Sequence, residues 1–122
     1  MSAPAPEGKL TTHVLDTAQG KPAARMAFVL LCHTDAGPTE LLDGATNADG
    51  RVDGPLLHGD ALKPGVYELR FDVAGYFKRC GHADAGKFLR AVPLVFHVDD
   101  EKAHYHVPLL VSPWSYSTYR GS

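Results

Sequence analysis

The sequence predicts an all-β sandwich, and three observations support this fold class. From Lys9 onward, short apolar runs alternate with clusters of Gly, Pro, Asn and Asp, which is the spacing of strands joined by tight turns. The run 66–73 alternates apolar and polar residues with the period of a half-buried strand. No internal repeat or low-complexity domain interrupts this pattern. We therefore expect one sandwich domain.

The bulk composition agrees with one globular domain and narrows the choice of partner. The chain has 122 residues, of which 44% are hydrophobic and 21% are charged, and these are ordinary globular values. The formal net charge of −2 argues against nucleic acid or an anionic membrane as the main partner. A small molecule or another protein is the expected partner.

The ends of the chain and its two cysteines indicate the compartment. Residues 1–8 form a Pro/Ala tail that we expect to be disordered, ahead of a domain over 9–122. The N-terminus lacks the apolar stretch of a secretory signal, and the longest apolar run, 26–32, is too short to span a bilayer. Cys32 and Cys80 have no CxxC spacing and are expected as reduced thiols. These features predict a cytoplasmic protein.

The first half of the chain contains two further predicted strands and one functional turn. The run 26–32 is apolar on both faces, so it should be an interior strand or a strand covered by a partner. A weaker strand over 39–46 ends at the turn-forming cluster 47–50. This turn delivers Arg51 at the exit of the loop.

The second half contains the only predicted helix and the last strands. Apolar residues over 74–80 fall at helical spacings, and Gly81 can stop the helix. The segments 91–98 and 104–111 read as strands joined by an acidic turn, and 115–119 forms a final short strand.

Side chains on a strand alternate between its two faces, so the strand 104–111 can be sorted without a structure. Its odd-numbered residues are all apolar or aromatic and should form the core. Its even-numbered residues place His106 above an apolar floor of Pro108 and Leu110. A monomeric sandwich would leave this face to water, so we expect it to be covered.

Two other segments show the same arrangement. Near the N-terminus, His13 shares a face with Thr11 and Leu15, and in the last strand Ser117 shares a face with Tyr119. If the three strands are neighbours, these faces merge into one mostly apolar patch with a few polar groups, which suits a small flat ligand. The predicted patch consists of His13, Leu15, His106, Pro108, Leu110, Ser117 and Tyr119.

One candidate chemistry for this patch is metal binding. His104 and His106 form an HxH pair, and His13 could complete a zinc site. Two side chains on one strand supply only part of that geometry, and no nearby Asp, Glu or Cys clearly supports the ligands.

Two other chemistries use the same histidines without a metal. A catalytic triad could combine His106 with Ser117 or Ser122, but no GxSxG nucleophile elbow is present. Alternatively, a histidine activates water while Arg51 binds or polarises an oxygen-rich substrate, which needs only groups that the patch already offers.

Several short segments from about Lys9 to Ser122 form a recognisable set. They are His13-Val14-Leu15-Asp16, Gly20-Lys21-Pro22-Ala23, Asp49-Gly50-Arg51, Tyr76-Phe77, His104-Tyr105-His106-Val107-Pro108-Leu109-Leu110, Ser112-Pro113, Tyr116-Ser117-Thr118 and Tyr119-Arg120-Gly121-Ser122. With these segments the chain resembles the transthyretin-like (prealbumin-like) family. The tetrapeptide 119–122 is the mark of the hydrolase branch of this family, whereas transthyretin itself, the hormone carrier, lacks that ending and the histidine and arginine matches.

The resemblance implies a fold and an assembly. The expected fold is a sandwich of two four-stranded sheets with one short helix. The expected assembly is a homotetramer, a dimer of dimers around a channel, and the predicted patch would face that channel. This would explain why an apolar face lies on the outside of a single sandwich.

The resemblance also implies an activity, the hydrolysis of 5-hydroxyisourate to 2-oxo-4-hydroxy-4-carboxy-5-ureidoimidazoline in urate (purine) catabolism, without a metal or organic cofactor. It places His13, Arg51 and His106 in the active site, with the histidines activating water and Arg51 stabilising the developing charge. Which histidine is the base stays open. The implied substrate-binding residues are His13, Arg51, Pro108, Leu110, Ser117, Tyr119, Arg120 and Ser122.

Two non-enzymatic alternatives remain at this point. The first is a carrier of a small aromatic ligand of the transthyretin kind, although a carrier channel has no need of two histidines and an arginine, whose desolvation is costly. The second is an accessory sandwich module of the carboxypeptidase-associated type, which would not need the C-terminal signature.

Overall fold

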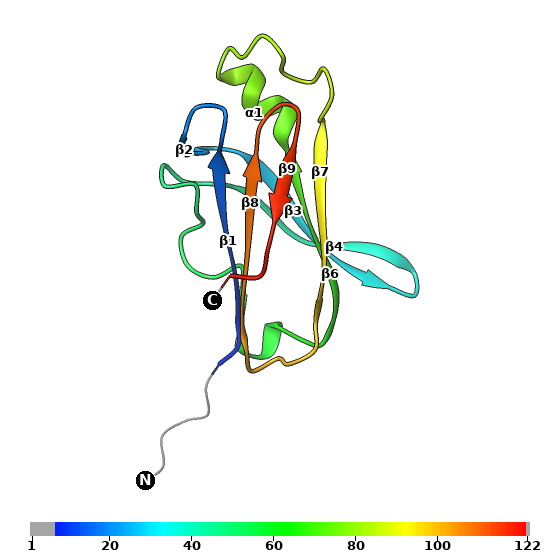
Figure 1. Ribbon diagram of the computed structural model, residues 1–122. Coiled ribbons are helices and arrows are strands. Elements are labelled where there is room, and N and C mark those ends of the chain that lie inside the picture. The colour runs from blue at the N-terminus through cyan, green and yellow to red at the C-terminus, as the bar shows by residue number, and fades with distance from the viewer. Residues whose placement is uncertain (1–6, 122) are drawn as a thin grey trace.

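The described residues, 7–121 of the computed structural model, form two stacked β-sheets with a short helix at one end (Figure 1). This confirms the predicted sandwich. The first sheet has the order β2 (Lys21–Pro22), β1 (Lys9–Asp16), β8 (His104–Val111), β9 (Tyr116–Thr118), and β5 (Leu57–His58) also pairs with β1. The second sheet has the order β4 (Gly37–Ala45), β3 (Ala27–Thr34), β6 (Gly65–Asp72), β7 (Ala91–Val98).

The first sheet differs in one respect from the expected four strands, because it has five. The additional pairing comes from β2 and β5, which each span two residues and both pair with β1. A two-residue strand is too short to show a side-chain period, so the sequence pattern does not reveal it. The predicted tail, 1–8, falls largely outside the described residues, which begin at Glu7.

The alternation predicted for β6 and β8 is confirmed by burial. On β6, Tyr67, Leu69 and Phe71 are buried in the core between the sheets. On β8, every odd-numbered residue from Tyr105 to Val111 is buried, as expected. The predicted interior strand is β3, which lies between β4 and β6.

The helix α1 (Val73–Arg79) closes one end of the sandwich and confirms the prediction to within one residue at each end. Its first turn is capped by the Asp72 side chain, which accepts a hydrogen bond from the backbone N–H of Gly75 at 3.0 Å. It ends before Gly81, whose φ of 75° lies in the left-handed region. In the described part of the chain, no helix has the length and apolar character needed to cross a membrane.

The parallel pairing of β1 with β8 joins the two ends of the chain in one sheet. Its register runs from Lys9 beside His104 to Asp16 beside Val111. The buried hydroxyl of Thr12 reinforces it by donating a hydrogen bond to the Val107 carbonyl oxygen at 2.7 Å. Because β9 pairs with the other edge of β8, the three strands that carry the predicted patch are neighbours, as the sequence analysis required.

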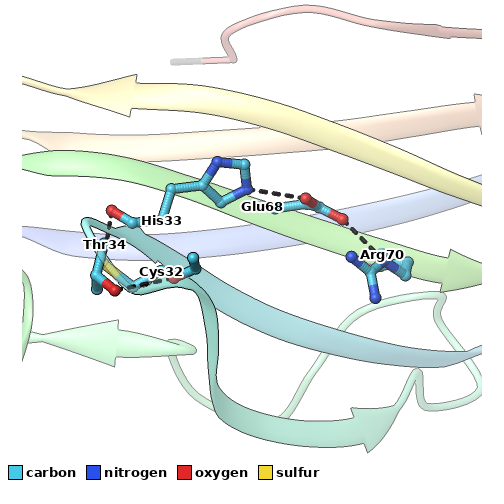
Figure 2. A network of polar contacts seen from close by, with 6 residues as sticks. Cys32, His33, Thr34, Glu68 and Arg70 are labelled. Atoms are coloured by element: carbon cyan, nitrogen blue, oxygen red, sulfur yellow. Dashed lines mark hydrogen bonds and ion pairs between the residues drawn. The ribbon is translucent and has the colours of Figure 1, made fainter.

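A polar cluster on the outer face of the second sheet ties β3 to β6 (Figure 2). The Glu68 carboxylate is 5% exposed and contacts Nε2 of His33 at 2.9 Å, while Nε of Arg70 donates to it at 2.8 Å. Burial alone would raise the pKa of Glu68, but the hydrogen bonds with His33 and Arg70 outweigh burial and hold this pKa below its usual value. The cluster therefore stabilises a charge on the sheet that does not carry the predicted patch.

We expect Tyr76→Phe to lower the free energy of unfolding by about 1–3 kcal/mol. Asp16 is completely buried, and the Tyr76 hydroxyl donates a 2.7 Å hydrogen bond to it. Removing this hydroxyl leaves a buried carboxyl oxygen with one donor fewer. Urea denaturation at one fixed protein concentration measures the change. The control Tyr116→Phe alters a tyrosine that is 44% exposed and should stay within about 0.5 kcal/mol of the parent. Equal effects of the two substitutions would contradict the prediction.

Candidate active site

The outer face of the first sheet collects the side chains of the predicted patch. Across the β1–β8 pairing, Thr11 lies beside His106, His13 beside Pro108 and Leu15 beside Leu110. Apart from Pro108, which is buried, these residues are partly buried and alternate with the core residues of their strands, so the set shares the face that points away from the core. His13 and His106, the two predicted active-site histidines, lie two register steps apart on adjacent strands.

Arg51 reaches this face through the turn that follows β4. The Asn47 side-chain oxygen accepts hydrogen bonds from the backbone N–H groups of Asp49 at 2.9 Å and Arg51 at 3.1 Å. Gly50 has a φ of 73°, and a Cβ there would overlap the Val14 carbonyl oxygen, so this close approach requires glycine. The result is an isolated β-bridge between Arg51 and His13. The predicted turn is therefore confirmed, and it delivers Arg51 directly beside β1.

His106 is held from both neighbouring strands. Its Nδ1 lies 2.8 Å from the Thr11 hydroxyl on β1. On the other side, the backbone N–H of Gly121 donates to the His106 carbonyl oxygen at 2.8 Å, and a Cβ at Gly121 would overlap the imidazole ring. This contact gives a physical reason for glycine in the C-terminal tetrapeptide.

The remaining residues of the C-terminal segment divide between two faces. Ser117 pairs with Leu110, which places it on the histidine face, and the same register continues to the bridge between His106 and Gly121. The Arg120 guanidinium instead lies 4.3 Å from the centre of the Tyr105 ring, which belongs to the core-facing side of β8. Its predicted contact with substrate stays a prediction.

Tyr119 is exposed. Together with Arg120, it borders a hollow of about 390 Å³ beside β7. By the β8–β9 register Tyr119 falls next to Pro108, at the edge of the histidine face. Ser122 lies outside the described residues. The structure thus assembles His13, Arg51, His106, Pro108, Leu110 and Ser117 on one face, and leaves the predicted substrate contacts of Tyr119 and Ser122 untested.

A hollow of about 480 Å³ opens on this face and is lined by Thr11, Arg51, His104 and His106, together with Lys9. Its volume lies in the range of small-molecule sites. From the sequence, His104 was a candidate only as a metal ligand, and Thr11 was placed only on the same face as His13. Thr11 lies two residues before His13 on the same face of β1. Once β1 and β8 were known to be neighbours, this position would have placed Thr11 and His104 at the hollow.

The site favours the neutral forms of His13 and His106. Burial lowers the pKa of His106, and the charges of Arg51, His104 and His13 lower it further. Burial and Arg51 also lower the pKa of His13, although a hydrogen bond with the Asp49 backbone and the Asp49 charge oppose part of this shift. Two neutral imidazoles beside a permanently charged guanidinium can accept protons and stabilise an anion.

The histidines are arranged around a hydroxyl. The rings of His104 and His106 have their centres 6.4 Å apart, and the Thr11 hydroxyl contacts a nitrogen of each. Within residues 7–121, no group of three or more His, Cys, Asp or Glu side chains has a geometry suited to one metal ion.

A model of the HIUase/Transthyretin family matches residues 10–121. The chain belongs to this family. A relative named 5-hydroxyisourate hydrolase, from Deinococcus radiodurans, is 54% identical over 113 residues, which cover 93% of this chain and 95% of the relative. The family resemblance predicted from the sequence motifs is therefore confirmed.

Two solved structures extend the comparison of this HIUase/Transthyretin family member. The crystal structure of (S)-allantoin synthase matches with a TM-score of 0.89 and 45% identity, over 96% of this chain and 44% of the synthase. Sea bream transthyretin in complex with thyroxine matches with a TM-score of 0.83 and 29% identity, over 93% of this chain and 94% of the transthyretin. Both support the fold, and the chain spans less than half of the synthase.

We expect Arg51→Gln to raise the pKa values of His13 and His106 toward 6.5, the ordinary histidine value. Removing the positive guanidinium stabilises the imidazolium forms of both histidines. Both rings should therefore take up protons at a higher pH than in the parent. An NMR titration of the imidazole C–H signals measures both values. The control Arg70→Gln removes an arginine from the second sheet and should leave both titrations in place. Unchanged titrations in the Arg51 variant would show that its charge does not act on these rings.

Proposed function

We propose that this chain hydrolyses 5-hydroxyisourate to 2-oxo-4-hydroxy-4-carboxy-5-ureidoimidazoline, a step of urate breakdown. The observation that carries this proposal is the arrangement of His13, Arg51 and His106 on one outward face: His13 forms a β-bridge with Arg51, and Arg51 and His106 line one hollow. The name of the relative from Deinococcus radiodurans supports the choice of substrate.

The reaction requires a water oxygen to attack a ring carbonyl carbon and the ring C–N bond to break. A neutral histidine removes the proton of the attacking water, and the pKa values of His13 and His106, both below the ordinary histidine value, leave these rings neutral near pH 7. Arg51 stabilises the negative charge that develops on the carbonyl oxygen. The protonated histidine then gives its proton to the departing ring nitrogen, so the protein ends in its starting state.

The rest of the outer face fits the binding of a flat, polar bicyclic molecule. Pro108 and the half-buried Leu110 supply an apolar floor beside the histidines, and Ser117 lies next to Leu110. Tyr119 and Ser122 would complete the wall of the site, as the family resemblance implies. The apolar part supplies contact area and the polar groups set the orientation of the ligand.

We also propose that four copies assemble as a dimer of dimers. The candidate site lies on an outer sheet face that carries the partly buried Leu15 and Leu110, which a second copy would cover. Two of the edge strands in the described sheets, β7 and β9, could pair with the same strands of another copy. Val95 on β7 is 56% exposed and would be available for such a contact.

The proposed compartment is the cytoplasm. Cys32 and Cys80 are free thiols, which agrees with a reducing environment. The formal charge of −2 gives no electrostatic reason for association with an anionic membrane.

We expect the protein to accelerate the decay of freshly made 5-hydroxyisourate, and His106→Asn to reduce turnover on the order of a hundredfold or more. Asparagine keeps hydrogen-bonding capacity but cannot act as an acid or base at this pH. Ultraviolet absorbance follows the decay with and without protein. The control His97→Asn replaces an exposed histidine of the second sheet and should leave turnover unchanged. If the parent does not accelerate the decay, the enzymatic proposal fails, and binding of a small aromatic ligand without turnover would favour a carrier.

We expect light scattering after size exclusion to give four times the chain mass of 13.1 kDa, and Leu110→Glu to shift the population to smaller species. The new carboxylate would be buried without a partner where two copies meet. The control Leu41→Glu changes a leucine that is already 44% exposed on β4 and should keep the parent mass. A monomeric parent at micromolar concentration would contradict the assembly.

A further inference from the structure

Besides Arg51 and His106, the hollow contains a hydrogen-bonded chain that links two histidines. We propose that Thr11 connects His106 to His104 as a proton relay, in which the Thr11 hydroxyl sets the tautomer of His106 and carries positive charge from His106 to His104. This inference rests on the proposed hydrolase function, and it assigns Thr11 and His104 roles in that reaction.

The Thr11 hydroxyl lies at a short distance from both histidines. The Thr11 oxygen Oγ1 lies 2.8 Å from Nδ1 of His106 and 2.9 Å from Nε2 of His104. The β1–β8 pairing holds this arrangement, because Thr11 is registered directly beside His106 and Lys9 beside His104. Both distances are those of well-formed hydrogen bonds.

A hydroxyl has a single proton, so Thr11 can donate to only one of these two nitrogens. In one arrangement Thr11 donates to Nδ1 of His106, which puts the His106 proton on Nε2. In the other, His106 donates from Nδ1 to Thr11, and Thr11 donates to Nε2 of His104. Only the second arrangement leaves Nε2 of His106, the nitrogen not engaged by Thr11, free to accept a proton from water.

The relay balances in protons and charge. After Nε2 of His106 has taken a proton from the attacking water, the Nδ1 proton moves to the Thr11 oxygen while the Thr11 proton moves to Nε2 of His104. His106 is then neutral and His104 is an imidazolium. The same two transfers in reverse return the charge to His106, which then protonates the departing ring nitrogen. No oxidant, reductant or co-reactant is needed.

The surroundings favour this direction of charge movement. His106 is half-buried, whereas His104 is exposed to solvent that can stabilise a cation. Burial lowers the pKa of His106, and the charges of Arg51, His104 and His13 lower it further. Lys9 also lines the hollow.

The β9 side of the relay carries one further charge. Nη2 of Arg120 donates a 3.4 Å hydrogen bond to the backbone carbonyl of His104, while its guanidinium lies over the Tyr105 ring. Arg120 therefore approaches the relay at the backbone of His104, on the strand that also carries His106.

The tautomer is measured first, because this readout needs no substrate. Imidazole ¹⁵N NMR of the full chain, above the titration of both rings, should show His106 protonated at Nδ1 and unprotonated at Nε2. Thr11→Val, which keeps the branched shape but lacks the hydroxyl, should move the proton to Nε2. Thr11→Ser keeps the hydroxyl and should keep the parent tautomer. A parent His106 protonated at Nε2, or a serine variant that behaves like valine, would overturn the proposal.

Kinetics then test the relay in turnover of 5-hydroxyisourate. Thr11→Val should lower kcat on the order of tenfold or more with little change in KM, and Thr11→Ser should restore most of the loss. In a His104→Gln background, Thr11→Val should cause a smaller loss than it causes in the parent, since the path to His104 is already cut. The control Thr39→Val alters an exposed threonine on β4 and should leave kcat unchanged.

Two kinetic results would overturn the relay. One is additive losses from the two substitutions, and the other is a Thr11→Val enzyme with the parent kcat. If the parent shows no hydrolysis at all, the proposed function fails, and the NMR result still decides whether Thr11 sets the His106 tautomer.

Discussion

The parallel pairing of β1 with β8 is the constraint on which the rest of the structure depends. It joins segments from opposite ends of the chain and pairs Thr11 directly with His106. A shift by one residue would turn the histidines of one strand into the core and expose its apolar residues, so burial of the core face selects the functional register. The hydrogen bond from Thr12 to the Val107 carbonyl adds a local lock on the same pairing.

Once β1 and β8 pair, the protonation of the histidines on the outer face of the first sheet depends on the groups that lie close to them. Three imidazoles and a guanidinium share this surface, and desolvation together with the charge of Arg51 favours the neutral forms of His13 and His106. Arg51 is brought there by a turn that needs glycine at position 50, and His106 is bordered by a glycine at position 121. The backbone geometry of two glycines thus determines how closely the charged and titratable groups approach.

The strands 91–98 and 104–111 were predicted at their observed bounds, because their flanking turns and alternation are strong local signals. The strands β2 and β5 were missed, since two residues carry no period. The contact of Thr11 with His106 could not be predicted, because these residues are 95 positions apart and the sequence does not specify which strands pair. Alternation turns Arg120 away from the face of Ser117, and its guanidinium packs on Tyr105, while its expected contact with substrate stays a prediction.

By itself, the sequence determined the sandwich class, the face on which each strand residue lies and the family to which the chain belongs. Alternation is a property of the extended backbone, so His106 and Leu110 share a face whatever the neighbouring strand is. The family resemblance implied that His13, Arg51 and His106 share one site, but only the tertiary structure decided which strand pairing and which bridge bring them together, and that Thr11 lies between two imidazoles. Strand order and register depend on contacts between distant segments and on the burial of a common core, which no local pattern contains.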